Sequence, residues 1–315
     1  MKNAIGYNSG VCKFSGKWQE NRNGEIVSYG AVATVEIGFT GNKIGVLCSD
    51  EEKTVLLDGK STEPEYYEKG IYLKTDNGRH TLKIISHPGN HIKLKGFCIS
   101  EDEEFFRTAD RKYIHFIGDS ITYNSTPGFP SATAIITDTD YSVEAFCGMS
   151  LVDGWGWYEI PKGLSKRPGM ESMYFKLEHP NEAVSYTDYR FEYCRQPDVT
   201  VIFLGTNDYI SNKEDKEKGN LEIFAEHYCA FVKKISEKYP ESEIVIMNAT
   251  SDPGYRREAI TLALKRIIKS GINAHLTPTE KWDIEISEDG THPTVCGYKQ
   301  IAENLANYLS RVFNL

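Results

Sequence analysis

Tyr113-Ile-His-Phe-Ile-Gly-Asp-Ser120 is the stretch of sequence that decides the fold. It begins as a short, largely apolar strand that ends at a glycine, and polar residues follow at once. Three later apolar segments follow, with helical segments between some of them, and the first two of these also lead to a glycine. These further predicted strands are 141–146, 199–204 and 244–247. The alternation of strands and helices predicts a parallel sheet that is covered by helices on both faces.

Two segments of this half have the periodicity of amphipathic helices. The first lies between the third and fourth strands, with apolar residues at 221, 224, 228, 231, 232 and 235. The second closes the chain, with apolar residues at 301, 305, 308, 309, 312 and 313. Pro293 suits the first turn of this last helix, because the N–H that proline lacks would have no partner there.

Residues up to about 105 have a different pattern, in which short strands alternate with turns and no helix is predicted. Asp58-Gly59 and Asn77-Gly78 are turn signals, and Asp-Gly in particular favours a two-residue hairpin. The predicted strands are 31–39, 43–48, 53–57, 71–74, 80–85 and 92–99. Strands of this kind predict an antiparallel sandwich or jelly roll. We therefore predict an all-β domain at 1–107 and an α/β domain at 108–315.

The polar residues that follow the strands predict a catalytic site. Ligands of open parallel sheets bind beyond the carboxyl ends of the strands, and Ser120, Gly148 and Asn207 lie just past such ends. A serine hydroxyl needs a base within hydrogen-bonding reach to act as a nucleophile. Ser120 is the candidate nucleophile and His292 the candidate base, while Asp289 can hold His292 in the productive tautomer.

Such a reaction also needs donors for the oxygen of the tetrahedral intermediate. The candidates are the backbone N–H groups of Ser120 and Gly148 and the side-chain amide of Asn207. Each motif has a structural interpretation as well. Ser120 would suit a helix N-cap, Gly148 a strand-end turn and 289–292 an ordinary turn before a helix. Asn207 and Asp208 would instead bond the turn that precedes them.

Aromatic residues crowd the segment between 153 and 193. Core packing is the usual explanation for such a cluster. Trp155 and Trp157 are the exceptions that we expect, because glycines flank them in a predicted loop. An indole ring beside a site can stack on a sugar or another planar group, so these two residues are the candidate substrate-binding residues.

The bulk properties exclude several classes of partner. The 315 residues carry a net charge of −9 with a pI near 5.5, which argues against binding nucleic acid or an anionic membrane through a basic surface. No apolar run approaches the ~20 residues needed to cross a bilayer. The first ten residues lack the pattern of a secretory signal, so a cytoplasmic location is the expectation, although a chain with its signal removed would look the same.

The cysteines also favour a cytoplasmic location. Seven of them are scattered along the chain with no Cys-x-x-Cys motif, which favours free thiols in a reducing compartment over disulfides or a zinc site. We expect neither a metal nor a cofactor. The oligomeric state stays open.

With Gly118-Asp-Ser120, a later glycine at 148, Gly205-Thr-Asn-Asp208 and Asp289-Gly-Thr-His292 in this order, residues 112–315 resemble the SGNH (GDSL-type) hydrolase superfamily. The resemblance implies a flavodoxin-like three-layer α/β/α sandwich. It also implies that Ser120 is the nucleophile, Gly148 and Asn207 oxyanion donors, and Asp289 and His292 the rest of the triad.

The β-rich front half together with this domain resembles carbohydrate esterase family two, whose members couple a jelly roll to an SGNH domain and remove acetyl groups from sugars. Local resemblances are Phe39 to Leu47, the turn at 57–59 and Gly78-Arg-His-Thr-Leu82. Members of that family often lack the acidic triad residue and use a backbone carbonyl, whereas Asp289 is present here. Export is usual in that family, yet no signal is visible here.

The expected function is therefore a serine esterase that removes acetyl groups from a small or oligosaccharide ester substrate through an acyl-serine intermediate. A lipid-directed or thioester hydrolase of the same superfamily is the first alternative, although the sequence shows no long apolar lid segment. A carbohydrate-binding protein without catalytic activity is the second. All five positions that the catalytic chemistry needs hold suitable residues, which argues against this second alternative.

Overall fold

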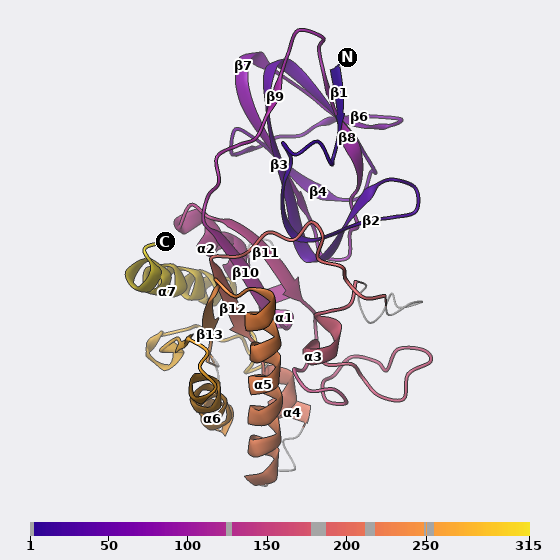
Figure 1. Cartoon of the computed structure of the whole chain (residues 1–315). Coiled ribbons are helices and arrows are strands. Elements are labelled where there is room, and N and C mark those ends of the chain that lie inside the picture. Colours follow the sequence, from indigo (N-terminus) through magenta and orange to yellow (C-terminus); the bar gives the residue numbers. More distant parts are fainter. Residues whose placement is uncertain (1–2, 124–127, 178–186, 212–217, 249, 251–254) are drawn as a thin grey trace. The chain divides into compact units, whose positions relative to one another are not determined.

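The structure, a computed structural model, describes residues 3–123, 128–177, 187–211, 218–248, 250 and 255–315. The chain divides into two compact units (Figure 1). The first comprises residues 1–110 and 189–195, and the second comprises 111–188 and 196–315. The sequence pattern gives no sign that 189–195 belong with the first unit.

The first unit consists of strands and loops, and its described residues form no helix. Its strands are β1 (Asn3–Gly6), β2 (Lys13–Glu20), β3 (Ile26–Cys48), β4 (Lys53–Leu57), β5 (Lys60–Ser61), β6 (Glu65–Tyr67), β7 (Gly70–Ser86), β8 (Lys93–Ile99) and β9 (Phe105–Phe106). β3 pairs antiparallel with β2, β7 and β9, and β8 pairs antiparallel with β1 and also pairs with β3. The predicted jelly-roll sandwich is confirmed.

Two long strands replace four of the short strands predicted from the sequence, because β3 and β7 each run without a break through two of them. The prediction of a turn at Asn77-Gly78 is therefore wrong. Gly78 pairs with Gly41 inside the β3–β7 ladder, and the register shifts between Gly41 and Lys43. Gly41 has a φ of 110°, so the ladder bends at a bulge here instead of reversing.

The hairpin predicted at Asp58-Gly59 is confirmed. These two residues join β4 to β5, and both have positive φ, 50° and 76°. A two-residue hairpin of type I′ requires positive φ at both central positions, which Asp and Gly adopt at low cost.

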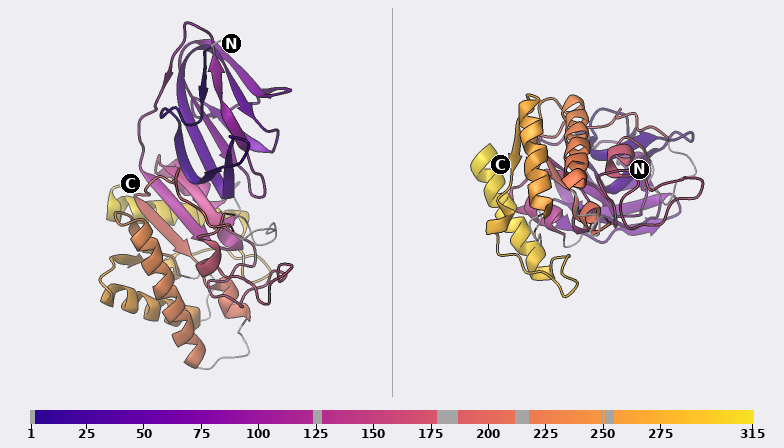
Figure 2. Two further views of the ribbon diagram at one scale, coloured as in Figure 1. Left: turned by 45° about the vertical axis from the view of Figure 1, so that its right-hand side comes forward. Right: turned by 90° about the horizontal axis from the view of Figure 1, so that it is seen from below.

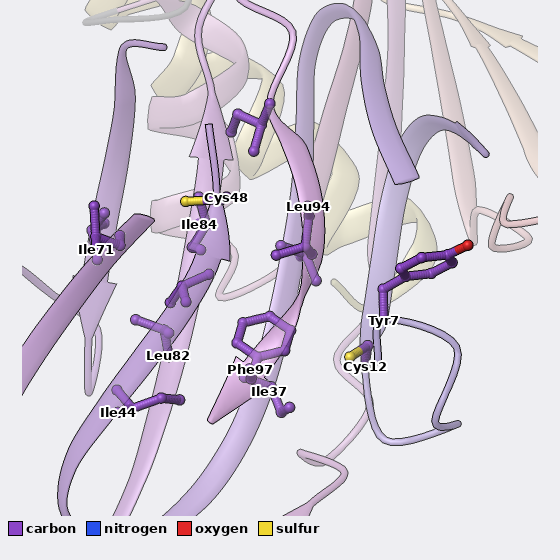
Figure 3. Close-up of a cluster of buried hydrophobic side chains, with 14 of the residues drawn as sticks. Tyr7, Cys12, Ile37, Ile44, Cys48, Ile71, Leu82, Ile84, Leu94 and Phe97 are labelled. Carbon is purple, nitrogen blue, oxygen red and sulfur yellow. The ribbon is translucent and has the colours of Figure 1, made fainter. Parts of the chain in front are cut away.

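Side chains from β3, β7 and β8 meet in one buried cluster (Figure 3). Members that the figure labels include Ile37, Ile44, Ile71, Leu82, Leu94 and Phe97. The fully buried Trp18 joins the same cluster, and its indole N–H donates to the carbonyls of Ser15 at 3.1 Å and Thr34 at 3.2 Å. Each fully buried large apolar side chain stabilises the fold by about 1.5–3 kcal/mol.

Residues 189–195 join this unit through specific contacts. The Trp18 backbone N–H donates to the Tyr189 hydroxyl at 3.3 Å, and the Arg190 backbone N–H donates to Gln19 Oε1 at 3.0 Å. The ring of Tyr193 lies edge-on to Phe14, with 5.8 Å between the centroids. These partners are more than 170 residues away in sequence, so no local pattern reveals the return of the chain.

The second unit is built on five parallel strands in the order β14-β13-β12-β10-β11. They are β10 (Tyr113–Gly118), β11 (Asp140–Ala145), β12 (Val199–Phe203), β13 (Glu243–Ile246) and β14 (Ala274–Leu276). The helices are α1 (Ser120–Tyr123), α2 (Phe129–Ile136), α3 (Met170–Met173), α4 (Thr206–Ser211), α5 (Lys218–Lys238), α6 (Tyr255–Lys269) and α7 (Val295–Phe313). α5 packs beside α6 on one face of the sheet and α2 beside α7 on the other (Figure 2). The predicted three-layer α/β/α fold is confirmed.

The last helix begins later than expected. Thr294 is its N-cap, and the Thr294 hydroxyl accepts a hydrogen bond from the Gly297 N–H at 3.1 Å. Pro293 lies before this cap and forms an isolated bridge with Ile286, so the placement of Pro293 in the first helical turn is wrong. Among the described residues, no helix is both long and apolar enough to span a membrane.

The strand order brings the predicted site residues to one edge of this sheet. β10 lies between β11 and β12, and its last residue, Gly118, is opposite Ala145 and Phe203. The chain leaves each of these strands toward the same edge, because parallel strands share one carboxyl end. Ser120, Gly148 and Asn207 follow within a few residues.

Candidate active site

Ser120 opens the one-turn helix α1 directly beyond β10. The buried Asp119 shapes this turn, since Asp119 Oδ1 accepts a hydrogen bond from the Ile121 N–H at 3.1 Å. Gly118 is required for the tight exit, because a Cβ at that position would collide with the Thr122 side chain and lie 3.0 Å from the Phe203 carbonyl oxygen. The strand, glycine and helix thus fix where the serine hydroxyl emerges.

The structure brings Ser120, His292 and Asp289 together. Ser120 Oγ lies 2.8 Å from His292 Nε2, although the two residues are 172 positions apart. His292 Nδ1 lies 2.6 Å from Asp289 Oδ2. In this arrangement Nδ1–H donates to the carboxylate, and Nε2 is left as the acceptor for the serine proton.

The turn that carries Asp289 is built around its carboxylate. Oδ1 accepts hydrogen bonds from the Thr291 N–H at 2.8 Å, the His292 N–H at 2.9 Å and the Ser287 hydroxyl at 2.7 Å. These bonds, with the one from the His292 ring, hold the pKa of Asp289 well below its ordinary value, the Thr291 N–H having the largest effect. The carboxylate therefore stays charged and keeps the imidazole in one orientation.

Gly148 lies in the loop that follows β11. Its φ is 75°, a conformation that glycine adopts without strain. The Gly148 carbonyl accepts a hydrogen bond from the Trp157 N–H at 3.0 Å, and a Cβ on Gly148 would lie 3.1 Å from the Tyr158 nitrogen. The loop therefore folds back on itself at Gly148 and leaves little room for a side chain there.

Asn207 is in the first turn of α4, beyond β12. Its side-chain Nδ2 donates to the Met149 carbonyl at 2.9 Å, so the amide contacts the loop of Gly148. Asp208 contacts the same loop, since its two carboxylate oxygens accept from the N–H groups of Leu151 at 2.8 Å and Val152 at 3.0 Å. Both side chains therefore reach a loop more than 50 residues earlier in the sequence, beyond their own turn.

The contact of Asp208 with the loop was not predicted. A motif read along the chain shows that Asp208 follows Asn207, but its acceptor role depends on backbone groups more than 50 residues earlier. Burial raises the pKa of Asp208 to about 7, with a further contribution from Asp119, while the backbone N–H bonds act in the opposite direction. The buried carboxyl groups of Asp119 and Asp208 thus lie close enough to affect each other's ionisation.

The two tryptophans differ in their surroundings. Trp157 is 58% exposed and its backbone is hydrogen-bonded to Gly148, whereas Trp155 is half-buried. Other aromatic residues of this segment, including Tyr158 and Tyr174, are buried. The structure therefore places an exposed indole ring next to the loop of Gly148.

Within the described ranges, no group of three or more His, Cys, Asp or Glu side chains is placed to hold a metal ion. All seven cysteines are free thiols, as the sequence predicted.

Comparisons with known proteins identify the family and the fold. The family model described as GDSL-like lipase/acylhydrolase matches residues 114–305. Among curated proteins, the chain is similar to an acetylxylan esterase/glucomannan deacetylase of Cellvibrio japonicus. The two are 23% identical over 226 residues, which are 62% of this chain and 59% of that protein. The chain thus spans about six tenths of the length of this curated relative.

Solved structures match both units. A family two carbohydrate esterase from Cellvibrio japonicus has a TM-score of 0.74 at 14% identity, over 99% of this chain and 98% of that one. A family two carbohydrate esterase from Clostridium thermocellum, in complex with cellohexaose, has a TM-score of 0.71 at 18% identity, over 96% of this chain and 99% of that one. These similarities establish the two-unit fold. Since the family model covers more than half of its residues, the chain belongs to the GDSL-like lipase/acylhydrolase family.

Proposed function

We propose that this protein is a serine esterase that removes acetyl groups from carbohydrates through an acyl-serine intermediate. The single observation that carries the proposal is the contact between Ser120 and His292, with Asp289 behind the imidazole. A hydroxyl, an imidazole and a charged carboxylate at these distances form the arrangement that activates a serine for acyl transfer.

The reaction needs two transfers. Ser120 Oγ attacks the acetyl carbonyl carbon while its proton passes to His292 Nε2, and the ester C–O bond then breaks as Nε2 returns that proton to the sugar oxygen. A water molecule next gives a proton to the same nitrogen as it attacks the acetyl carbon of the acyl-serine. The bond between that carbon and Ser120 Oγ then breaks, Nε2 returns the proton to Oγ, and acetate leaves. Asp289 keeps its charge throughout and stabilises the imidazolium.

The proposed oxyanion donors are the backbone N–H groups of Ser120 and Gly148 and the side-chain amide of Asn207. The bond from Asn207 Nδ2 to the Met149 carbonyl supports this assignment, because it ties the amide to the loop that carries Gly148. Donors held in place before the reaction are effective since they need not reorganise as charge develops. Loss of one such donor typically lowers turnover by about 10²–10³-fold.

The carbohydrate substrate class is supported by two further observations. The curated relative is named an acetylxylan esterase/glucomannan deacetylase, and the esterase from Clostridium thermocellum was solved with cellohexaose. Trp157 also offers an exposed aromatic ring beside Gly148, and such a ring can stack on the apolar face of a pyranose. We propose Trp157, with the half-buried Trp155 beside it, as substrate-binding residues.

Acetate release tests the proposal. The purified protein should release acetate from acetylated xylan or glucomannan and cleave p-nitrophenyl acetate much faster than p-nitrophenyl octanoate. Ser120→Ala should abolish both activities and leave the melting temperature unchanged. Faster cleavage of the octanoyl ester would favour a lipid-directed hydrolase instead. Failure of a fluorophosphonate probe to label Ser120 would favour a carbohydrate-binding protein without catalysis.

A further inference from the structure

Two consecutive residues of α4 hold the loop that carries Gly148. Asn207 Nδ2 donates to the Met149 carbonyl, and the Asp208 carboxylate accepts the N–H groups of Leu151 and Val152. We call the two bonds of Asp208 the Asp208 clamp. The clamp joins the segment that follows β11 to the segment that follows β12, across 56 and 57 residues of sequence.

The clamp satisfies backbone groups that would otherwise be costly to bury. Leu151 and Val152 are 0% and 4% exposed, and Asp208 is 2% exposed. A buried N–H that loses its partner destabilises that conformation, because the N–H has given up its hydrogen bonds to water without a replacement. Without the carboxylate, a conformation of the loop that exposes both N–H groups to water would therefore become lower in free energy than the one seen here.

Other bonds fix the far side of the same loop, so such a movement would be transmitted toward Gly148. The carbonyls of Ser150 and Leu151 accept from the N–H groups of Met170 at 2.8 Å and Glu171 at 3.2 Å. The Gly148 carbonyl is bound to the Trp157 N–H. Gly148 precedes the clamped residues Leu151 and Val152 in the same loop, and the Trp157 bond holds its carbonyl, so the orientation of the Gly148 peptide depends on that bond and on how the clamp holds the loop.

We propose that Asp208 is a positioning residue of the esterase reaction, which aims the Gly148 N–H and the Asn207 amide at the oxyanion through the clamp. This inference rests on the proposed function. Asp208 takes no part in bond making, because its two oxygens are occupied by the loop. Its role is to keep both donors in one arrangement while charge develops on the substrate oxygen.

The electrostatic surroundings of Asp208 are consistent with a functional role. Burial and the neighbouring Asp119 oppose its ionisation, so a carboxylate is a costly way to fasten a loop. An ionised carboxylate accepts two N–H groups at once, whereas an amide in the same place offers one acceptor oxygen. Asn is the conservative variant for this reason, since it can keep one of the two bonds.

The test compares Asp208→Asn and Asp208→Ala with a control, Asp198→Asn. Asp198 also binds a backbone N–H, that of Tyr113 at 2.9 Å, but at the amino end of β10, away from the site. Each variant is measured for kcat and KM on p-nitrophenyl acetate, for melting temperature, and for the rate of Ser120 labelling by a fluorophosphonate. The labelling reaction needs the oxyanion donors but no acetyl ester, so it reports on the clamp separately from the substrate class.

The expected result is a graded loss. Asp208→Asn should lower kcat and the labelling rate by about 10-fold and Asp208→Ala by about 10²–10³-fold, with KM within threefold of wild type. Asp198→Asn should keep kcat and the labelling rate. Asp208 variants that lose melting temperature but keep both rates while folded would overturn the inference and leave the proposed function intact. If the wild type labels at Ser120 without cleaving acetyl esters, the proposed function fails, and the labelling rates alone decide the role of Asp208.

Discussion

The second unit and the first each contain a hydroxyl, an imidazole and a carboxylate in hydrogen-bond contact. In the second unit these are Ser120, His292 and Asp289, at 2.8 and 2.6 Å. In the first unit Thr75 Oγ1 lies 2.7 Å from His80 Nε2, and His80 Nδ1 lies 2.8 Å from Asp58 Oδ2. We call this second group the Thr75 cluster. The distances alone do not distinguish the two groups.

The surroundings of the two groups distinguish them. The His292 and Asp289 side chains are 41% and 50% exposed, and Ser120 emerges at the edge of a parallel sheet beside a loop with positive φ. His80 is buried inside the β3–β7 ladder, with its ring 5.4 Å from that of Phe39. The Thr75 hydroxyl also contacts the carbonyl of Asp76. The imidazole of the Thr75 cluster is therefore covered, at 7% side-chain exposure, where that of His292 is open to solvent.

The electrostatics assign the Thr75 cluster a structural role. Burial lowers the pKa of His80, but hydrogen bonds to Asp58 and the Asp76 carbonyl and the charges of both carboxylates raise it above its ordinary value overall. Asp58 also accepts the Thr81 N–H at 2.8 Å. The cluster thus holds the β4–β5 hairpin turn against β7.

The largest expected effect separates the two groups by activity. Ser120→Ala and His292→Ala should each lower kcat/KM on p-nitrophenyl acetate by about 10⁴–10⁶-fold, because nucleophile and base act as a unit. Thr75→Ala should keep kcat/KM within twofold of wild type. A loss above tenfold in folded Thr75→Ala would show that the first unit contributes to the reaction.

An intermediate effect is expected at the acidic residue of the triad. Asp289→Asn should lower kcat by about 10²–10⁴-fold, since an amide can hold the imidazole in the wrong tautomer. Steady-state kinetics with a circular-dichroism control measure this effect. Activity within threefold of wild type would mean that another group, such as a backbone carbonyl, orients His292.

The smallest effect is on stability. A histidine whose pKa is raised by folding contributes stability that is complete below its ordinary pKa of 6.5 and is lost as the pH rises through the folded-state value. His80→Gln should therefore lower the free energy of unfolding by about 1–3 kcal/mol at pH 5.5, and by less at pH 8.5. Urea unfolding at the two pH values measures this difference. Equal losses at both would contradict a charged His80.

Sequence patterns were sufficient wherever the cause of structure is local. Short apolar segments that alternate with helical ones predicted β10, β11, β12 and β13, and Asp58-Gly59 predicted its hairpin because positive φ favours those residues. Asn77-Gly78 carried a similar signal, but pairing with Gly41 over a long ladder outweighed it. The preference of Asn-Gly for a turn stabilises that turn by less than the ladder hydrogen bonds and the buried cluster stabilise the continuous strand.

The residue types of the site, and its place at the carboxyl edge of the sheet, were determined by the sequence alone, because parallel strands separated by helices have few possible arrangements. Only the tertiary structure decided which of the two imidazoles, His292 or His80, is open to solvent and which is buried. It also decided that Asp208 holds a loop more than 50 residues away and that residues 189–195 return to the first unit. The physical reason is that hydrogen bonds between distant segments depend on how the whole unit packs. Such packing produces no repeating pattern in the sequence.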